Sequence, residues 1–385
     1  MIGSGTAPIH QGQLVAHYRK ALKWSQQDLA DALGVSLRTV QRLEQTPMIE
    51  DIKRRDFLVK LLGIPAALMA VEYDNILSNK KSPLPLNDDL MTYLENALIM
   101  RFEAHQAGGM RSASRGLDIW MNEVTHFVAQ TEGAGWHSRA LAVLSMSYLL
   151  QGAVSRSMQL NFTVAHQTYC KAYQIAQELD DPELMALALF RDSVAFLTED
   201  KPYEAITHLK GALDIINGHG FPHLKGHILK LLSEAYAKAQ MPQEAWRSVG
   251  LAESTLSQLG DQPERSKYTQ REFSFATVTA QRGVDAAFLK DYERAIKLID
   301  KGLLDINPTL IPTRARLTVQ KAEAYYGLGQ IDFCIFHAEE SLKLARSVGS
   351  NKTIDRIKGL HTTLILSRWN REPSVRRLGA LLASS

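Results

Sequence analysis

The residues that most clearly point to chemistry are Arg38, Gln41 and Arg42, at positions i, i+3 and i+4 of a short predicted helix. An arginine side chain can pair with both acceptors of a guanine edge, and glutamine can pair in the same way with adenine. The helical spacing places the three side chains on one face. The pattern therefore predicts a surface that reads base edges, with Arg38 and Arg42 on guanine and Gln41 on adenine.

The chain around these residues predicts two short helices joined by a tight turn. Ser25 and Ser36 are typical N-cap residues, so we expect helices over residues 26–33 and 37–45. Gly34 supplies the positive φ that the turn needs. Apolar residues recur at the spacing that lets two helices cross, namely Leu29, Ala30, Leu33, Val35, Val40 and Leu43. Together with a preceding helix, this is a helix-turn-helix, whose second helix enters the DNA major groove.

The segment resembles the lambda- and 434-repressor-like (Xre-type) helix-turn-helix, with the motif Ser25-Gln26-Gln27-x-Leu29-Ala30, Gly34-Val35-Ser36 and Thr39-Val40-x-x-Leu43-Glu44. The resemblance implies an internal salt bridge between Arg19 and Glu44. After Glu44 the chain departs from the family, because Thr46-Pro47 leads into a basic run and not into a Gly turn. Three members of the expected DNA-binding set, Gln26, Gln27 and Ser36, would hold phosphates. The full set is Gln26, Gln27, Ser36, Leu37, Arg38, Thr39, Gln41 and Arg42.

Residues 53–71 look like a twin-arginine export signal, with Lys53-Arg54-Arg55 before the apolar run LLGIPAALMAV. The run is too short to span a bilayer, and export signals lie at the N-terminus. We expect a basic helix that contacts the DNA backbone or packs under the helix-turn-helix, with residues 61–71 buried. Export or membrane insertion, from an internal start such as Met48, is the alternative.

Two closely spaced prolines, Pro83 and Pro85, break any helix over residues 80–85 and indicate a linker. The expected organisation is therefore a DNA-binding domain over residues 10–72, a linker over 73–87 and a helical repeat domain over 88–385.

The positive charge of the chain is concentrated at its start. Residues 1–60 hold nine Lys and Arg against six Asp and Glu, whereas the remaining residues hold 35 of each sign. The excess lies where phosphate would be met. Two distant cysteines, Cys170 and Cys334, indicate a reducing compartment without disulfides. Because residues 1–13 do not resemble a signal peptide, we expect a cytoplasmic protein that does not enter a membrane.

No pattern in the sequence predicts catalysis. The chain has no glycine-rich phosphate loop, nucleophile elbow, HExxH or CxxC. His219, His223 and His227 are spaced to place two imidazoles on one helix face, but no Cys, Asp or Glu joins them at ligand spacing. We therefore expect no enzyme activity, no metal site and no cofactor.

From about residue 138 the chain repeats with a period near 40 residues. Turn prolines mark two series, Pro182, Pro222 and Pro263, and Pro202 and Pro242. Small residues recur on the second helix of each pair, at Ala165, Ala205, Ala245, Ala295 and Cys334, and at Ala172, Ala212, Ala252 and Ser341.

The pattern resembles tetratricopeptide repeats and predicts five helix pairs, with further helices near 87–130 and 351–383 and an insertion near 260–285. The expected fold is all-α, with the helix-turn-helix domain followed by a tetratricopeptide-like right-handed α-solenoid.

In tetratricopeptide repeats the first helix of each pair faces a concave groove, which typically binds a peptide. A cationic groove could hold a peptide carboxylate or an acidic side chain. An ordinary solvated helix face is the other interpretation of each position. The register gives the expected ligand-binding set as His227, Lys230, Glu234, Lys238, Arg316, Glu323 and Tyr326.

The combination of an Xre-type domain with a long tetratricopeptide-like region resembles the peptide-pheromone receptors of Gram-positive quorum sensing, the Rap/Rgg/NprR/PlcR/PrgX family. The resemblance implies a transcription regulator that binds double-stranded DNA as a homodimer, at half-sites about 34 Å apart or a multiple of that. It also implies a signalling peptide in the groove, which changes the superhelix pitch.

Two alternatives remain open. The repeats could be a scaffold that recruits a protein partner to DNA without a small ligand. A weaker alternative is a role in phosphatase chemistry through a partner. The C-terminal helix with Trp369, Leu378 and Leu381 is a candidate dimer surface.

Overall fold

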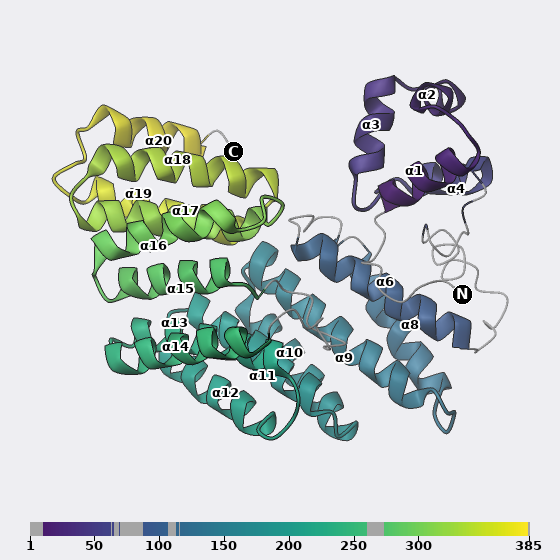
Figure 1. The fold of residues 1–385 in the computed structure, drawn as a ribbon, viewed down its shortest axis with the longest axis horizontal. Helices are drawn as coiled ribbons and strands as arrows, with labels where there is room; N and C mark the ends of the chain where they lie inside the picture. Colours follow the sequence, from purple (N-terminus) through teal and green to yellow (C-terminus); the bar gives the residue numbers. More distant parts are fainter. Residues whose placement is uncertain are drawn as a thin grey trace. The chain divides into compact units, whose positions relative to one another are not determined.

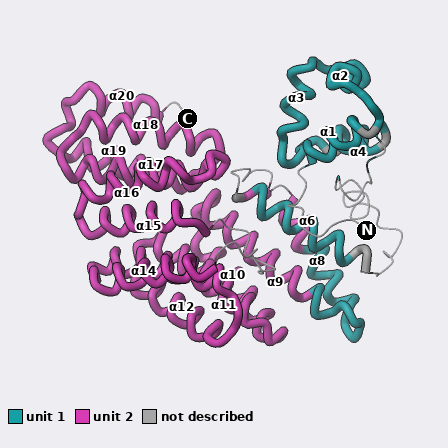
Figure 2. Tube along the Cα trace, in the orientation of Figure 1, with its two compact units in different colours: residues 1–104, 122–140 teal, residues 105–121, 141–385 magenta. Residues whose placement is uncertain are grey.

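The structure, a computed structural model, describes residues 11–62, 64, 69, 88–106, 113–114, 116–259 and 273–383. Every regular element in these ranges is a helix (Figure 1), which confirms the predicted all-α class. Contacts divide the chain into two compact units, residues 1–104 with 122–140 and residues 105–121 with 141–385 (Figure 2). The predicted linker over 73–87 lies outside the described residues, and the predicted domain boundaries stay predictions.

The first unit begins with four short helices, α1 (Gln11–Ala21), α2 (Gln26–Leu33), α3 (Leu37–Gln45) and α4 (Ile52–Leu62). The bounds of α2 and α3 are those predicted from the sequence. Ser25 caps α2 and Ser36 caps α3, each by accepting a main-chain N–H of the first turn. Gly34 has φ 64°, the left-handed conformation that ends α2 and starts the turn.

The helix-turn-helix closes around a small apolar core. The close approach of α1 to the end of α3 requires glycine at position 12, because a Cβ there would lie 2.4 Å from the carbonyl oxygen of Leu43. Burial of such side chains stabilises the domain by about 25 cal/mol per Å² of apolar surface. The buried members are Val15, Leu29, Ala30, Val40, Leu43, Ile49, Leu58, Leu62, Ile64 and Met69.

The segment with the twin-arginine pattern forms α4 and packs under the helix-turn-helix. Leu58 and Leu62 belong to its core, and Arg55 is buried and donates to the carbonyl oxygen of Met69 at 3.1 Å. Lys53 and Arg54 are exposed. Part of the apolar run lies outside the described residues. In the part of the chain that the structure describes, no helix is long and apolar enough to cross a membrane.

Two further helices, α6 (Asp88–Gln106) and α8 (Leu117–Gln130), precede the repeats, as predicted. The repeats follow as consecutive helix pairs. The pairs are α9 (His137–Val154) with α10 (Phe162–Glu178), α11 (Pro182–Thr198) with α12 (Pro202–Ile215), α13 (Pro222–Lys238) with α14 (Pro242–Leu259), α15 (Phe275–Phe288) with α16 (Tyr292–Asp305), α17 (Ile311–Gly327) with α18 (Ile331–Ser347), and α19 (Asn351–Ile365) with α20 (Pro373–Ala383). The first half of the predicted insertion, residues 260–272, lies outside the described residues, and the second half includes the start of α15.

Turn residues and small residues explain the repeat. Asp180, Asp200, Gln240 and Lys290 adopt positive φ at the turns, and four helices begin at the predicted prolines, where the missing N–H has no intrahelical partner to lose. The small residues predicted on the second helices are buried. The fourth pair uses a glycine that the pattern missed, because a Cβ on Gly302 would lie 2.6 Å from the Cβ of Ala280.

The first helices of successive pairs form a continuous row. Each of α11, α13, α15 and α17 contacts the first helix of the next pair, and α19 ends the row. α19 also contacts η2 (Ser155–Gln159), a π-helical segment that follows α9. We call α11, α13, α15, α17 and α19 the first-helix row.

The C-terminal helices close the second unit with their own apolar cluster. Leu378 is fully buried in it, and Trp369 and Leu381 pack against it. Leu378 therefore belongs to the core, whereas Trp369 and Leu381 are partly buried, and a dimer surface on this helix stays a prediction.

Candidate nucleic-acid interface and interior polar cluster

The exposed face of α3 carries Arg38, Gln41 and Arg42. Among the described residues, none forms a hydrogen bond or ion pair with these three side chains. Leu37 lies beside them and is 38% exposed. Long side chains that are exposed and unpaired are available for base edges and phosphates.

The other predicted DNA-binding residues have contacts within the domain. Ser36 and Thr39 hydrogen-bond each other through their hydroxyl groups at 2.8 Å. Gln27 donates to Asp31 at 2.8 Å, and Gln26 donates to Glu44 at 2.7 Å. The side chain of Gln26 therefore stabilises the domain. The main-chain N–H groups in the first turn of α2 are still able to bind a phosphate.

The predicted salt bridge between Arg19 and Glu44 is present and buried. Arg19 Nε donates to Glu44 Oε1 at 2.6 Å, and Arg19 Nη1 donates to the carbonyl oxygen of Trp24 at 2.6 Å. Burial acts to raise the pKa of Glu44, but the hydrogen bonds from Arg19 and Gln26 outweigh it and lower the pKa. The pair fixes the end of α3 against α1, and with it the direction of the exposed face.

In the second unit, the first-helix row brings together a set of charged and amide side chains that we call the interior polar cluster. Arg316 of α17 lies 3.3 Å from Glu234 of α13, and Gln281 of α15 donates to the same carboxylate at 3.2 Å. The cluster comprises Glu234, Gln281, Asp285, Arg316, Gln320, Glu323, Lys352 and Arg356.

A second ion pair in the cluster joins α17 to α19. Arg356 Nε donates to Glu323 Oε1 at 2.7 Å, and its Nη2 also donates to Gln320. Burial acts to lower the pKa of Arg356, but Glu323 and Glu234 raise it overall. The guanidinium is therefore a fixed positive charge that ties two successive repeats together.

The pKa values of two carboxyl groups in the cluster are shifted in opposite directions. Burial acts to raise the pKa of Glu234, but the surrounding cations, first Arg316, lower it below its ordinary range. Burial raises the pKa of Asp285 to about 8, although Gln281 donates to it at 2.9 Å. At neutral pH the cluster therefore holds an ionised Glu234 beside a protonated Asp285.

The structure brings together three of the seven ligand-binding residues predicted from the sequence, Glu234, Arg316 and Glu323. His227 is buried, with its ring 5.3 Å from that of Phe273. Lys230 lies over the same Phe273 ring, with its amino nitrogen 6.0 Å from the centroid.

Tyr326 lies outside the cluster, and Lys238 lies at its edge, because its charge helps to lower the pKa of Glu234. Lys238 pairs with Asp200 at 2.8 Å and lies over Phe288. Tyr326 packs against the C-terminal apolar cluster. We therefore leave these two side chains, with His227 and Lys230, out of the proposed binding site.

Sequence reasoning missed Gln281, Gln320, Lys352 and Arg356. A signal was available, because Lys352 and Arg356 are four residues apart on α19 and so share a helix face. The groove register ended with the fifth pair, and its extension to the sixth pair would have included both residues.

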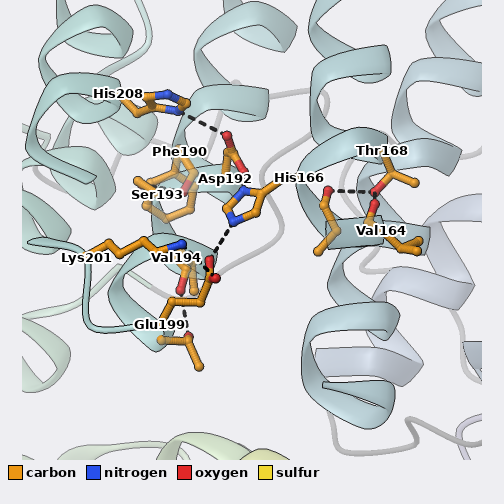
Figure 3. Close-up of polar contacts among 12 residues, drawn as sticks. Val164, His166, Thr168, Phe190, Asp192, Ser193, Val194, Glu199, Lys201 and His208 are labelled. Atoms are coloured by element: carbon orange, nitrogen blue, oxygen red, sulfur yellow. Dashed lines mark hydrogen bonds and ion pairs between the residues drawn. The ribbon is translucent and has the colours of Figure 1, made fainter. Parts of the chain in front are cut away.

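A different cluster joins α10, α11 and α12 (Figure 3). The ring of His166 bridges two carboxylates, with Nδ1 against Asp192 and Nε2 2.6 Å from Glu199. His208 lies 3.2 Å from the other oxygen of Asp192, and Lys201 lies 3.0 Å from Glu199. Burial acts to lower the pKa of His166, but Glu199 and Asp192 raise it overall. Both ring nitrogens face acceptors, so the protonated ring fits this place best.

Within the described residues, no group of three or more His, Cys, Asp and Glu is arranged to hold a metal ion. Two of the three spaced histidines, His223 and His227, face the same ring of Phe273, as their spacing on one helix face predicts, whereas His219 stacks on Phe221.

A pocket of about 320 Å³ lies among α16, α17 and α18. Its polar side chains are already paired, because Lys321 lies 2.6 Å from Asp300 and Arg314 donates to the carbonyl oxygen of Leu303 at 3.0 Å. A third lining residue, His337, lies 3.1 Å from Glu340. Each of these charged side chains has a partner, whereas Lys352 of the interior polar cluster has no carboxylate within ion-pair distance among the described residues, so we do not place the binding site in this pocket.

Comparison with known proteins places a family on one segment. Residues 15–46 match the family model described as Helix-turn-helix, which confirms the resemblance read from α1 to α3. No curated protein matches the chain.

Several solved structures are similar to the chain at low sequence identity. One is a Rap protein complexed with competence and sporulation factor, with 15% identity and a TM-score of 0.46 over 87% of this chain and 97% of that one. Another is aspartyl phosphate phosphatase F from Bacillus subtilis, with 14% identity and a TM-score of 0.45 over 89% and 96%. A third is BtubC from P. vanneervenii, with 16% identity and a TM-score of 0.42 over 60% and 91%.

Proposed function

We propose that this protein is a sequence-specific DNA-binding transcription regulator. The observation that carries the proposal is the contrast within the helix-turn-helix. Gln26, Gln27 and Thr39 all have partners in the domain, whereas Arg38 and Arg42 on α3 are exposed and have none among the described residues. A rigid frame with free guanidinium groups on its second helix is what base reading in the major groove requires.

Selection of duplexes from a random DNA library with the full-length protein, at one stated salt concentration, tests this proposal. Enrichment of an inverted repeat would support a homodimer on two half-sites, and the spacing should be about 34 Å or a multiple of that. The matched variant is Arg38→Ala, which should no longer enrich the wild-type site. If wild-type protein enriched no sequence, the proposal would be wrong.

The second part of the proposal is that the repeats bind a regulatory ligand, a short signalling peptide, at the interior polar cluster. Charged side chains from α13, α17 and α19 converge there, and Lys352 is a basic side chain of the cluster without a carboxylate at ion-pair distance among the described residues. Arginine pairs well with carboxylates, so a peptide with an acidic side chain or a free C-terminus fits. Binding would shift the repeat conformation and thereby operator affinity.

Affinity selection from a synthetic library of random heptapeptides, read by mass spectrometry, tests the ligand proposal. We expect wild-type protein to retain peptides that are enriched in acidic side chains relative to the library, and Arg316→Gln to lose them while it still binds DNA. Thermal stability should rise with each retained peptide as mass action requires. Equal retention by wild-type and Arg316→Gln protein would contradict the site.

The alternative function, a scaffold that recruits a protein to DNA, is favoured by one observation. Phe333 and Phe336 on α18 are 56% and 61% exposed, and exposed aromatic side chains are frequent at protein interfaces. Under this alternative no peptide in the library would raise thermal stability, and Phe336→Ser would abolish partner capture without any effect on DNA binding.

A further inference from the structure

The last helix of the first-helix row, α19, contacts η2, the segment that follows α9. We call this contact the seam. The side-chain amide of Asn351, the first residue of α19, donates to the carbonyl oxygen of Met158 in η2 at 2.7 Å. η2 is a five-residue π-helical segment, and the residue that follows it, Leu160, has φ 52°. Short π-helical segments cost stability and are frequent at functional sites. The seam therefore joins an irregular segment to the N-terminus of a helix 193 residues away in the chain.

The cations near the seam are not balanced by carboxylates. Arg316 pairs with Glu234 and Arg356 pairs with Glu323, so these four charges cancel. Lys352 of α19 has no carboxylate within ion-pair distance among the described residues, although Glu234 lies within electrostatic reach.

Arg156 of η2 is the second cation at the seam without a carboxylate partner among the described residues. Its side chain is enclosed, since the residue is 7% exposed and its Nε is buried without a hydrogen-bond partner. A buried guanidinium with unused donors is costly unless something compensates its charge.

Lys352 lies in the positive potential of Arg156, Arg316 and Arg356 and of the N-terminus of its own helix. Burial lowers the pKa of Lys352 well below its ordinary value, and Arg156 is the next cause in size. Lys352 is also the second residue of α19, where the helix dipole is positive and disfavours a cation. Like charges repel, so Arg156 and Lys352 oppose the contact between η2 and α19 to which the Asn351 hydrogen bond contributes.

We propose that Arg156 and Lys352 bind an oxyanion, a carboxylate or a phosphate group, which neutralises the seam and holds η2 against α19. Arginine supplies paired N–H donors for such a group and lysine supplies a point charge. This inference rests on the proposed function, because the oxyanion would be a group of the regulatory ligand proposed above. The site itself is tested without DNA, so its failure is distinguishable from failure of DNA binding.

The first test compares the melting temperature of the full-length protein in sodium chloride, sodium acetate and sodium phosphate at constant pH and ionic strength. We expect acetate or phosphate to raise the Tm by ~2–5 °C over chloride at saturation. In chloride, Lys352→Gln should have a higher Tm than wild type, because the repulsion between Lys352 and Arg156 is relieved. Acetate and phosphate should then no longer raise the Tm of this variant. The matched control is Lys358→Gln, an exposed lysine of the same helix, which should keep the increment. Equal increments in Lys352→Gln and wild-type protein would overturn the proposal.

The two sources of the oxyanion are separated by the probes. A larger response to N-acetyl-dialanine with a free carboxylate than to its amide would identify a peptide terminus as the ligand. A larger response to inorganic phosphate would identify a phosphate group. No response to any of the three anions would contradict the site.

The second test measures the seam directly, so that it does not depend on global stability. Spin labels at Gln159→Cys and Asp355→Cys, both exposed positions, flank the seam. The exposed Cys170 is replaced by serine, and the buried Cys334 is retained. The anion that raises the Tm most in the first test should narrow the distance distribution between the labels. The same labels in a Lys352→Gln background should show no response, whereas an unchanged response there would overturn the role of Lys352.

Discussion

Arg19 and Glu44 form a bidentate ion pair inside the helix-turn-helix, with Nε to Oε1 at 2.6 Å and Nη2 to Oε2 at 3.3 Å. Both side chains are less than one-tenth exposed. The pair joins the last turn of α1 to the last turn of α3, and Gln26 adds a bond from α2. One carboxylate therefore contacts all three helices of the motif, and the orientation of α3 depends on it.

Arg19→Met should destabilise the N-terminal domain by about 3–5 kcal/mol, because the carboxylate of Glu44 would remain buried without its cation. Hydrogen exchange of α1 to α3, followed by mass spectrometry of the full-length protein, localises the effect. Gln27→Ala is the control, since its bond to Asp31 is exposed. Equal protection of these helices in Arg19→Met and wild-type protein would contradict the structural role of the pair.

Arg38→Ala should weaken binding to a selected operator by ~1–3 kcal/mol and leave binding to random duplex nearly unchanged, because a base contact is lost. Lys20→Ala should weaken binding to both duplexes alike and reduce the salt dependence of affinity, because exposed Lys20 lies on α1 and not on the base-reading helix α3, so we expect it to contact phosphates. Fluorescence anisotropy at several salt concentrations measures both. Equal losses on the two duplexes for Arg38→Ala would exclude base reading by this residue.

Asp285→Asn should stabilise the protein at neutral pH. The pKa of Asp285 is raised from 3.8 to about 8. The folded state therefore retains a proton that the unfolded state loses, so stability falls as pH rises from about 4 to 8. The slope from this group is at most about 1.4 kcal/mol per pH unit.

Urea unfolding at pH 5, 6.5 and 8 should show a flatter profile for Asp285→Asn than for wild type, with the largest gain at pH 8. Asparagine keeps an oxygen that can accept from Gln281. Parallel profiles for the two proteins would mean that Asp285 is ionised in the folded state.

His166→Gln should remove a stabilising contribution that is present only at lower pH. Because the folded pKa of His166 is raised above 6.5, its contribution is complete below that pH and is lost as pH rises through the folded pKa. The expected result is a loss of stability at pH 6 and little change at pH 9. The titration of the His166 ring by NMR gives the pKa directly. His219→Gln, in an exposed turn, should have no effect at either pH.

Gly283→Ala should destabilise the second unit by ~1–3 kcal/mol, because the new Cβ would lie 2.8 Å from the main-chain nitrogen of Ile299 and force α15 from α16. Gly250→Ala is the matched control, because a Cβ there meets nothing within 4 Å. The control should gain up to about 1 kcal/mol from helix propensity. Calorimetric melting of both variants measures the contrast, and a stable Gly283→Ala protein would show that the two helices can separate at little cost.

The local sequence determined the elements of this protein. Caps, a positive-φ glycine and apolar spacing fixed α2 and α3 to the residue, because these signals act within one helical turn. The repeat prolines and small residues fixed the helix pairs for the same reason. The exposed residues of α3 were also predictable, since helical periodicity alone decides which side chains point away from the core.

Only the tertiary structure decided which polar side chains meet. The sequence predicted that both Lys238 and Arg316 line the groove. In the structure Lys238 forms an ion pair with Asp200, whereas Arg316 forms one with Glu234. The seam between Met158 and Asn351 has no local signal, because it depends on the accumulated rotation of all the repeats between them. A small error in each step would separate these residues, so their contact, and the imbalance of charge beside it, exists only in the folded chain.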